Sequence, residues 1–463
     1  MEYRIIDYEQ LAKTFNFKQN EDKKIHLQHT SGNKCKLFPY TTKKNEINSF
    51  SGVIGEFSRT VTGKKNIDLD KQQLMDKIIS HVVSHGNQDV LQSVIDELFF
   101  SDQDELVIAH PAFFNYIPSS KQESDLGQFL ADILVTDQLK ENIWERYKSE
   151  PSNVILKLVY KSLPSLENKS IKSGRYRLYH SHIQNQFEND LSFLLENEKL
   201  FLNHFEDLLL YYYFYYITQL VLHFERFFDD KQLIYPVYYN LDWEKKRTKS
   251  RISYQEGWKV IEPKISRLFA HVNCLEMINY MRNSNEFISY QGLRTFLESL
   301  NEDDKDQLRL EMQTLVQEYK DRVQDINWKE FRSPKNRYDE PLFNEVRSLL
   351  YQLDYQFKES GRKRNSREFY MGFLIFAKQY FLKQSGPLGY TLNLKQDFFI
   401  FLTKLCINKR EKIALKELFN EFEKRGIYFD LDSKKAIIDL YEKLNLLEKK
   451  SDSGDAQYVK YIS

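Results

Sequence analysis

Glycine and proline, the residues that most often interrupt regular structure, are scarce in this chain. Only 15 glycines and 10 prolines occur among 463 residues, about half of the usual share of the two together. Hydrophobic residues make up 41% of the chain and aromatic residues 15%, which is enough apolar surface to build extensive cores. The composition therefore predicts long helices with short connections, arranged in two to four domains.

One stretch is apolar enough to resemble a membrane span. Leu208–Phe224 contains no Asp, Glu, Lys or Arg, but five tyrosines lie inside it. A membrane-spanning helix carries its tyrosines at the two interfaces instead. The stretch is therefore predicted to be a helix buried on all sides in a helical domain, and no contact with a membrane is expected.

The cysteines and the first residues indicate the compartment. Cys35, Cys274 and Cys406 are widely spaced and form no disulfide or zinc-binding pattern. The first residues mix acidic side chains into a segment with no apolar core of the length that a signal peptide needs. These features predict a cytoplasmic protein.

Three consecutive domains are predicted. Residues 1–165 begin with a short β-hairpin over residues 25–38, because apolar residues alternate on both sides of Ser31-Gly32-Asn33, and continue as helices. Residues 166–385 form an aromatic-rich helical domain. Residues 386–463 form the third domain.

The third domain has the most recognisable element order. Helices are predicted at Asp397–Ile407, at Leu415–Phe422 with a left-handed stop at Gly426, and after a cap at Asp432 or Ser433. A hairpin follows, around the turn Ser-Asp-Ser-Gly-Asp. This order is typical of a winged helix-turn-helix. The predicted fold class is thus mainly α, with a multi-helical body, a small N-terminal β element and a C-terminal winged helix-turn-helix.

Several segments also carry a resemblance to a known family. They are HTSGNKCKLFPYTTK (residues 29–43), GVIGEFSR (52–59), GPLGYTLNLKQDFFIFLTKLCI (386–407), KIALKELFNEFEKRGIYFD (412–430) and KLNLLEKKSDSGDAQYVK (443–460). The chain resembles the DptG (also called DndG) family in these segments. The resemblance implies a subunit of the antiviral restriction system that acts with DNA phosphorothioation, working beside DptF-like and DptH-like subunits with ATPase or translocase features. It implies no active site, because the family has no established catalytic motif to transfer.

Basic residues are concentrated toward the C-terminal end. Residues 361–463 contain 20 Lys and Arg and 13 Asp and Glu, a net charge of +7, whereas residues 1–360 contain 47 and 54, a net charge of −7. A loop over residues 360–367 and the winged helix are therefore predicted to contact the phosphates of double-stranded DNA. The predicted DNA-binding residues are Arg362, Lys363, Arg364, Arg367, Lys434, Lys435, Lys449, Lys450 and Lys460.

A second basic patch leaves two interpretations open. It consists of Lys245, Lys246, Arg247, Lys249 and Arg251, flanked by tyrosine and tryptophan. This interleaving suits phosphate contacts combined with base stacking, but it equally suits a solvated loop between two buried segments.

Acidic residues on the winged helix leave a further alternative. Asp439, Glu442, Asp452 and Asp455 would face DNA phosphates and weaken binding. A winged helix that docks a partner protein, in a pure adaptor, therefore remains an alternative to DNA contact.

Motifs for catalysis or for bound cofactors are weak. The best nuclease candidate is Glu262-Pro263-Lys264 with Asp242 upstream, and a helix start is the favoured interpretation of that triplet. The paired histidines are His26 and His29, His81 and His85, and His180 and His182; none has a carboxylate at ligand spacing. A non-catalytic protein with no metal, no cofactor and no small-molecule substrate is predicted, with a metal-dependent nuclease as the alternative.

Overall fold

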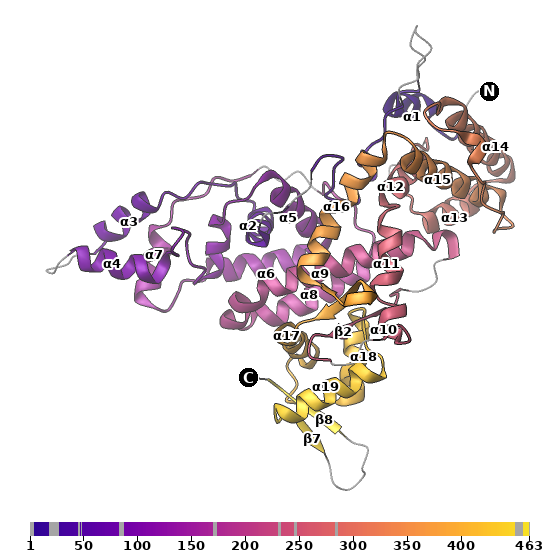
Figure 1. Ribbon diagram of the computed structural model, residues 1–463. Coiled ribbons are helices and arrows are strands. Elements are labelled where there is room, and N and C mark those ends of the chain that lie inside the picture. The colour runs from indigo at the N-terminus through magenta and orange to yellow at the C-terminus, as the bar shows by residue number, and fades with distance from the viewer. Residues whose placement is uncertain are drawn as a thin grey trace. The chain divides into compact units, whose positions relative to one another are not determined.

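The computed structural model is mainly helical (Figure 1). It describes residues 4–17, 27–44, 47, 49–82, 88–169, 174–229, 233–244, 248–282, 286–449 and 457–462. These ranges contain nineteen α-helices and only a few short strands, of two to five residues, which confirms the predicted mainly α fold. Among the helices described, none is both long and apolar enough to cross a lipid bilayer.

The chain divides into two units, each assembled from three separate stretches. The first unit comprises Met1–Glu46, Ile217–Tyr239 and Lys246–Asn393, and the second comprises Ile47–Tyr216, Asn240–Lys245 and Leu394–Ser463. The units do not coincide with the three consecutive ranges predicted from the sequence. One reason is helix α9 (Glu198–Phe224), which begins in the second unit and ends in the first.

The first unit is built around helix α12, which is buried along its whole length. Helix α15 packs against both α12 and α14, and β3 pairs with β4 in an antiparallel hairpin. The elements are α1 (Tyr8–Phe15), η2 (Phe227–Asp229), β1 (Val237–Tyr238), α10 (Ile252–Gln255), α11 (Trp258–Ile265), α12 (Leu268–Ile278), α13 (Tyr290–Ser299), α14 (Glu302–Arg322), η3 (Trp328–Glu330), α15 (Pro341–Glu359), α16 (Lys363–Tyr380), β3 (Leu382–Gln384), η4 (Gly386–Leu388) and β4 (Tyr390–Leu394).

The predicted N-terminal hairpin is wrong for the residues that are described, because residues 27–44 contain no strand. Glu276 of α12 supplies the acceptors that a partner strand would supply. Its fully buried carboxylate accepts hydrogen bonds from the backbone N–H groups of Asn33, Lys34 and Cys35, at 2.9 to 3.1 Å. A buried acceptor in this position satisfies consecutive backbone donors without a β ladder.

His29, in the same segment, closes a ring of hydrogen bonds. Arg362 Nη1 donates to His29 Nδ1 (3.2 Å), and His29 Nε2 lies 3.1 Å from the hydroxyl of Tyr319. Tyr319 donates to the amide oxygen of Gln356, whose Nε2 donates to Asp325 (3.0 Å). Asp325 in turn accepts from Arg362 Nε at 3.4 Å. Burial, and then the nearby Arg362, hold the pKa of His29 well below its ordinary value.

Replacing His29 with asparagine should make the free energy of unfolding less sensitive to pH. The unfolded chain takes up a proton on His29 below about pH 6.5, whereas the folded protein excludes it. The stability due to neutral His29 is therefore complete above about pH 6.5 and is lost on acidification, by up to about 1.4 kcal/mol per pH unit. Urea unfolding at about pH 7.5 and about pH 5.5 should show wild type losing about 1 kcal/mol more than His29→Asn. Equal losses in the two proteins would contradict this origin of the pH dependence.

The second unit combines an N-terminal helical part with the C-terminal elements. Helices α2 and α5 pack closely where Gly127 of α5 faces Val53 of α2. The approach is too close for a side chain at Gly127, since an added Cβ would lie 2.6 Å from the carbonyl oxygen of Val53. The elements are α2 (Phe50–Thr62), α3 (Lys71–Ser80), α4 (Gln88–Phe99), η1 (Pro111–Tyr116), α5 (Lys121–Leu134), α6 (Asp137–Lys148), α7 (Val154–Ser162), α8 (Ser181–Leu195), the main part of α9, β2 (Asn240–Leu241), α17 (Gln396–Ile407), β5 (Lys412–Ala414), α18 (Leu415–Lys424), β6 (Ile427–Tyr428), α19 (Leu431–Lys443), β7 (Leu447–Lys449) and β8 (Gln457–Lys460).

Helix α9 contains the uncharged aromatic stretch. Every residue from Leu208 to Phe224 is buried. The prediction of a helix buried on all sides is therefore confirmed.

Candidate nucleic-acid interface

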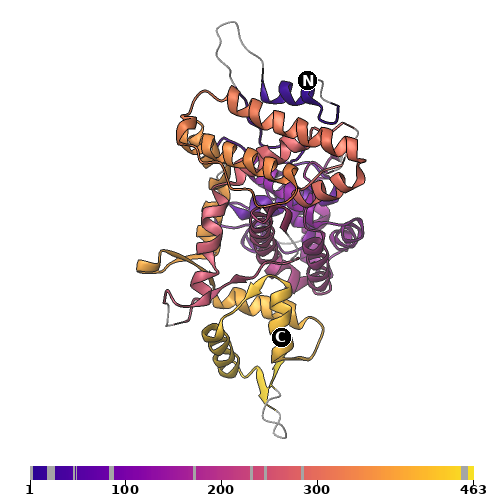
Figure 2. The same ribbon diagram turned by 90° about the vertical axis from the view of Figure 1, so that its right-hand side faces the viewer.

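The elements from α17 to β8, drawn in yellow tones in Figure 2, are named here the C-terminal module. They include one three-stranded antiparallel sheet. The strand order is β5-β8-β7, with Ile413 opposite Val459 and Lys412 opposite Lys460. Because side chains alternate along a strand, Ile413 and Val459 share the buried face, and Lys412 and Lys460 share the other.

The module is held to α8 and α9 of the same unit by a buried ion pair. Arg425, at the end of α18, donates from Nη2 to Asp190 Oδ1 (2.5 Å) and from Nε to Asp190 Oδ2 (2.9 Å). The hydroxyl of Tyr212 donates to the same carboxylate at 2.7 Å, and the hydroxyl of Tyr211 donates to the backbone carbonyl of Arg425. Burial lowers the pKa of Arg425, but Asp190 together with other neighbouring groups holds that pKa well above its ordinary value.

The turn between α18 and α19 depends on Gly426. Its φ of +76° is the left-handed stop predicted from the sequence, and an added Cβ would overlap the ring of Tyr215. The predicted cap is two or three residues too late. Asp430 caps α19, with its side chain accepting from the N–H of Ser433 at 2.9 Å.

Several of the predicted DNA-binding lysines of the module are already paired with acids. Lys449 lies 2.7 Å from Glu442, and Lys434 lies 3.9 Å from Glu423 and over the ring of Phe419. Lys435 and Lys460 are exposed, and their side chains have no hydrogen bond or ion pair with any described residue. Lys416 and Lys443, which sequence reasoning did not single out, are in the same situation. Lys450 and the predicted acidic positions Asp452 and Asp455 lie outside the described residues.

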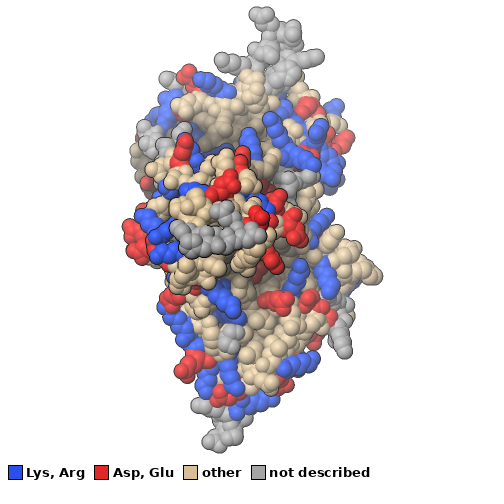
Figure 3. Space-filling view, turned by 90° about the vertical axis from the view of Figure 1, so that its left-hand side faces the viewer, with Lys and Arg blue, Asp and Glu red and all other residues tan. Residues whose placement is uncertain are grey.

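The module is close to neutral. Residues 394–463 contain 14 Lys and Arg and 12 Asp and Glu, a net charge of +2, whereas residues 361–393 contain 6 and 1, a net charge of +5. Most of the positive charge at the C-terminal end of the sequence thus lies in α16 and the β3–β4 hairpin of the first unit. Figure 3, which shows one face of the molecule, has blue and red side chains largely interspersed.

The predicted basic loop over residues 360–367 is wrong from Lys363 onward, because α16 begins there. Lys363, Arg364 and Arg367, named here the α16 cluster, are exposed. None of the three side chains has a hydrogen bond or an ion pair with any residue described in the structure. Arg362 differs from them, because its guanidinium belongs to the His29 ring.

The second basic patch can be described only in part. Lys249 is exposed, whereas Arg251 is 6% exposed at the start of α10. Lys245, Lys246 and Arg247 lie outside the described residues. Of the two residues that are described, only Lys249 is open to a nucleic acid.

The nuclease triplet does not lie on a strand. Glu262, Pro263 and Lys264 belong to α11, with Pro263 in its last turn, so the predicted helix start is misplaced as well. The Glu-x-Lys motif of a metal-dependent nuclease needs a strand at this position. In the described part of the chain, no three His, Cys, Asp or Glu side chains come together as metal ligands. His26 and His85 lie outside that part.

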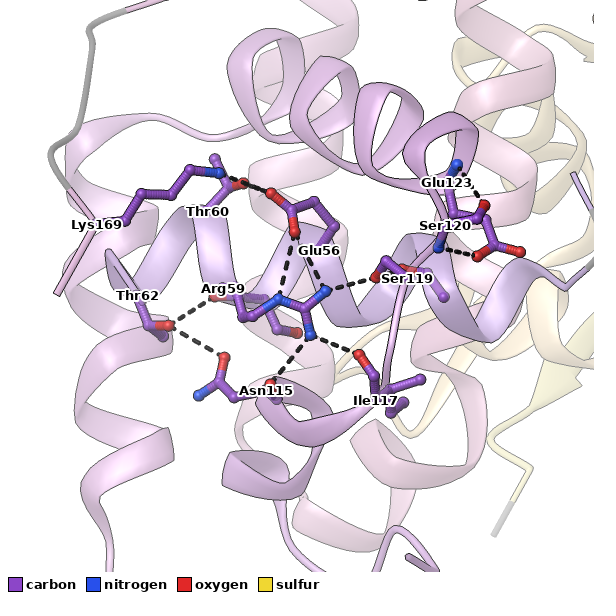
Figure 4. A network of polar contacts seen from close by, with 12 residues as sticks. Glu56, Arg59, Thr60, Thr62, Asn115, Ile117, Ser119, Ser120, Glu123 and Lys169 are labelled. Carbon is purple, nitrogen blue, oxygen red and sulfur yellow. Dashed lines mark hydrogen bonds and ion pairs between the residues drawn. The ribbon is translucent and has the colours of Figure 1, made fainter. Parts of the chain in front are cut away.

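The GVIGEFSR segment lies on α2 and forms a buried polar network (Figure 4). Arg59 donates to Glu56 at 3.2 and 3.3 Å, to the carbonyl of Asn115 at 3.1 Å, and to the carbonyl of Ile117 and the hydroxyl of Ser119 at 2.5 Å. The guanidinium is thus committed within the protein, and the segment joins α2 to η1 and to the connection before α5.

Comparison with known proteins adds no assignment. No protein-family model matches the chain, and no curated protein matches it.

Proposed function

We propose that this chain is a non-catalytic subunit of a phosphorothioation-dependent DNA restriction complex and contacts DNA phosphates through the α16 cluster. The observation that carries the proposal is the presence of three exposed cations within five residues, none of whose side chains has a partner among the described residues. Unpaired Lys and Arg side chains neutralise phosphates and release counterions, which supplies most sequence-independent affinity for DNA. The resemblance to the DptG family supplies the context, and with it DptF-like and DptH-like partner subunits.

The C-terminal module has a supporting role in this proposal. Its elements follow the order helix, strand, helix, the two-residue strand β6, helix and two strands, with one three-stranded sheet. Apart from β6, this order is typical of a winged helix. In such a domain α19 would be the recognition helix, with Lys435 exposed on it and Lys460 on the sheet. A net charge of +2 suits a few phosphate contacts better than an extensive interface.

A specific observation favours a second candidate function, that of an adaptor. Leu431, the first residue of α19, is 78% exposed, and Leu444, just after the helix, is 42% exposed. Lys434 and Lys449 are drawn toward acids of the module itself. Exposed leucines at both ends of a helix suit docking of a protein better than contact with DNA.

Reversing the charge of the α16 cluster should weaken DNA binding by at least about tenfold. The variant Lys363→Glu/Arg364→Glu/Arg367→Glu removes up to three phosphate contacts, so the slope of log K against log salt should fall by up to about 3. Fluorescence anisotropy with a labelled duplex, over a range of salt concentrations, measures both quantities. The matched control carries the same charge change at three exposed cations of the second unit that have no described partner: Lys121→Glu, Arg177→Glu and Lys199→Glu.

If both triple variants weakened DNA binding equally, the loss would come from the change in net charge alone, and this result would contradict the proposed contact. Unchanged DNA affinity in the α16 variant, together with loss of DptF-like or DptH-like subunits from the purified complex in Leu431→Asp, would favour the adaptor.

A further inference from the structure

Helix α4 of the second unit exposes a row of apolar side chains. Val90, Val94 and Leu98 are 60%, 40% and 52% exposed, and their spacing of four residues places them on one side of the helix. The other side of α4 packs into a core with α3 and α7 (Figure 1), through Ile95 and Phe99. Apolar side chains that are exposed together mark a surface that binds another protein.

The segment that contains α4 is strongly acidic. Residues 66–110 hold 9 Asp and Glu and 2 Lys and Arg, a net charge of −7. Glu97, Asp102 and Glu105, named here the α4 acids, are exposed, and their side chains have no hydrogen bond or ion pair with a described residue. Glu97 lies in the last turn of α4, and the other two follow the helix. A helix dipole disfavours negative charge at this end, so Glu97 does not stabilise its own helix.

Helix α16 of the first unit has the opposite arrangement. The α16 cluster lies in its first two turns, where the helix dipole disfavours positive charge, and no acidic residue lies in the first turn. Met371 and Leu374 follow at four and seven residues after Arg367, on the same side of the helix, and they are partly exposed. Each helix thus joins an apolar row to charges that its own dipole disfavours, which are negative at the C-terminal end of α4 and positive at the N-terminal end of α16.

The excess charge of the chain is concentrated in the two segments that contain these helices. Residues 66–110 carry a net charge of −7 and residues 361–393 a net charge of +5, whereas the rest of the chain holds 59 Lys and Arg and 57 Asp and Glu, a net charge of +2. The complement of the acidic segment is therefore present on every copy of this chain. Complementary charge on two surfaces steers them together and selects how they pair.

We infer that this protein self-associates through an antiparallel contact between α4 of one copy and α16 of a second copy. Antiparallel helices bring the α4 acids against the α16 cluster and the apolar row of α4 against Met371 and Leu374. The contact also relieves the unfavourable interaction of each charged group with its own helix dipole. It uses the α16 cluster that we propose to contact DNA, but it does not rest on that proposal, because it is tested without DNA.

Sedimentation velocity of the full-length protein tests the inference. At about 50 mM salt the average mass should rise above that of the monomer between about 1 and 100 μM protein, a range that suits a small interface between two helices. At about 500 mM salt the mass should return toward that of the monomer, because salt screens exposed charges. A protein that stays monomeric over this concentration range at low salt would overturn the inference.

Two charge-reversed variants identify the surfaces that meet. The variant with all three α4 acids replaced by lysine should be monomeric, and so should the variant with all three residues of the α16 cluster replaced by glutamate. An equimolar mixture of the two should associate, because the unchanged α4 of one variant can bind the unchanged α16 of the other. Association of the mixture also shows that both variants are folded. Association of either variant alone, or a mixture that stays monomeric, would overturn the inference.

A matched control separates the α4 contact from an effect of net charge. It carries the same charge change at three exposed acids of the second unit whose side chains have no described partner: Glu141→Lys, Glu145→Lys and Asp439→Lys. This control should associate, whereas loss of association equal to that of the α4 variant would overturn the inference. Val94→Ser/Leu98→Ser should weaken association at least about fivefold by removing apolar contacts. Val154→Ser, at a valine of α7 that is 81% exposed, should leave it unchanged. Equal association of these two variants would likewise contradict the proposed contact.

Discussion

Replacing Arg425 with alanine should lower the free energy of unfolding of the second unit by about 3–5 kcal/mol. The side chains of Arg425 and Asp190 are 3% and 0% exposed, and two hydrogen bonds join them. Alanine removes the guanidinium and leaves the Asp190 carboxylate buried and without a positive partner, with the hydroxyl of Tyr212 and the side-chain amide of Gln186 as its remaining described donors. An uncompensated buried charge is among the most destabilising changes that a single substitution can make.

Urea unfolding followed by circular dichroism measures this loss, and Lys412→Ala is the matched control. Lys412 and Glu448 also form an ion pair within the second unit, but their side chains are 38% and 35% exposed. An exposed pair contributes at most about 1 kcal/mol. Replacing both buried partners, as Asp190→Leu/Arg425→Met, should recover much of the loss because neither charge is then left alone. A loss in Arg425→Ala as small as that in Lys412→Ala would contradict the anchoring role of the pair.

Arg425 also shows where sequence reasoning stops. Counted along the chain, it is one more positive charge in a basic C-terminal part, and Gly426 beside it is correctly predicted as a left-handed stop. A glycine that ends a helix can be predicted from the sequence, because it comes directly after the helical pattern of apolar residues. The partner of Arg425 lies 235 positions earlier in the sequence, and no local pattern identifies it.

The same contrast explains the N-terminal segment and the aromatic stretch. Burial of Leu208–Phe224 is predictable because the composition of that stretch already requires it. The apolar residues that alternate on both sides of Gly32 suggest a hairpin, but a hairpin forms only where a second strand supplies the hydrogen-bond acceptors. Glu276, more than two hundred residues away, supplies them instead. A helix carboxylate that replaces a strand leaves no signal in the segment that it binds.

The candidate sites follow the same pattern. The three cations of the α16 cluster are among the residues predicted from the sequence, but the run of charges does not distinguish them from Arg362, whose guanidinium is bonded to His29 and Asp325. The interpretation of residues 360–367 as a loop failed because Gly361 and a run of charges look like a connection, whereas α16 begins two residues after that glycine.

The second large expected effect is at Arg59, in the GVIGEFSR segment. Arg59→Ala should lower the free energy of unfolding by about 3–5 kcal/mol. The side chain is fully buried, and alanine would leave the carbonyls of Asn115 and Ile117 without their shared donor. Burial lowers the pKa of Arg59, and Glu56 partly offsets that effect. An arginine nevertheless stays charged in a protein, so its hydrogen bonds are what make its burial tolerable.

Two further variants assign the loss to those hydrogen bonds. Arg59→Met fills most of the same volume without any donor, so it should lose nearly as much stability as alanine if unsatisfied acceptors dominate, and much less if packing dominates. Arg177→Ala, at an exposed arginine of the same unit with no described partner, should change the free energy of unfolding by less than about 0.5 kcal/mol. Glu56 keeps hydrogen-bond donors in every case, because Lys169 donates to it at 2.8 Å and the hydroxyl of Thr60 at 3.4 Å. A loss of unfolding free energy in Arg59→Ala as small as that in Arg177→Ala would contradict this role of Arg59. The packing of α2 against α5 at Gly127 would then stabilise this part of the unit without the guanidinium.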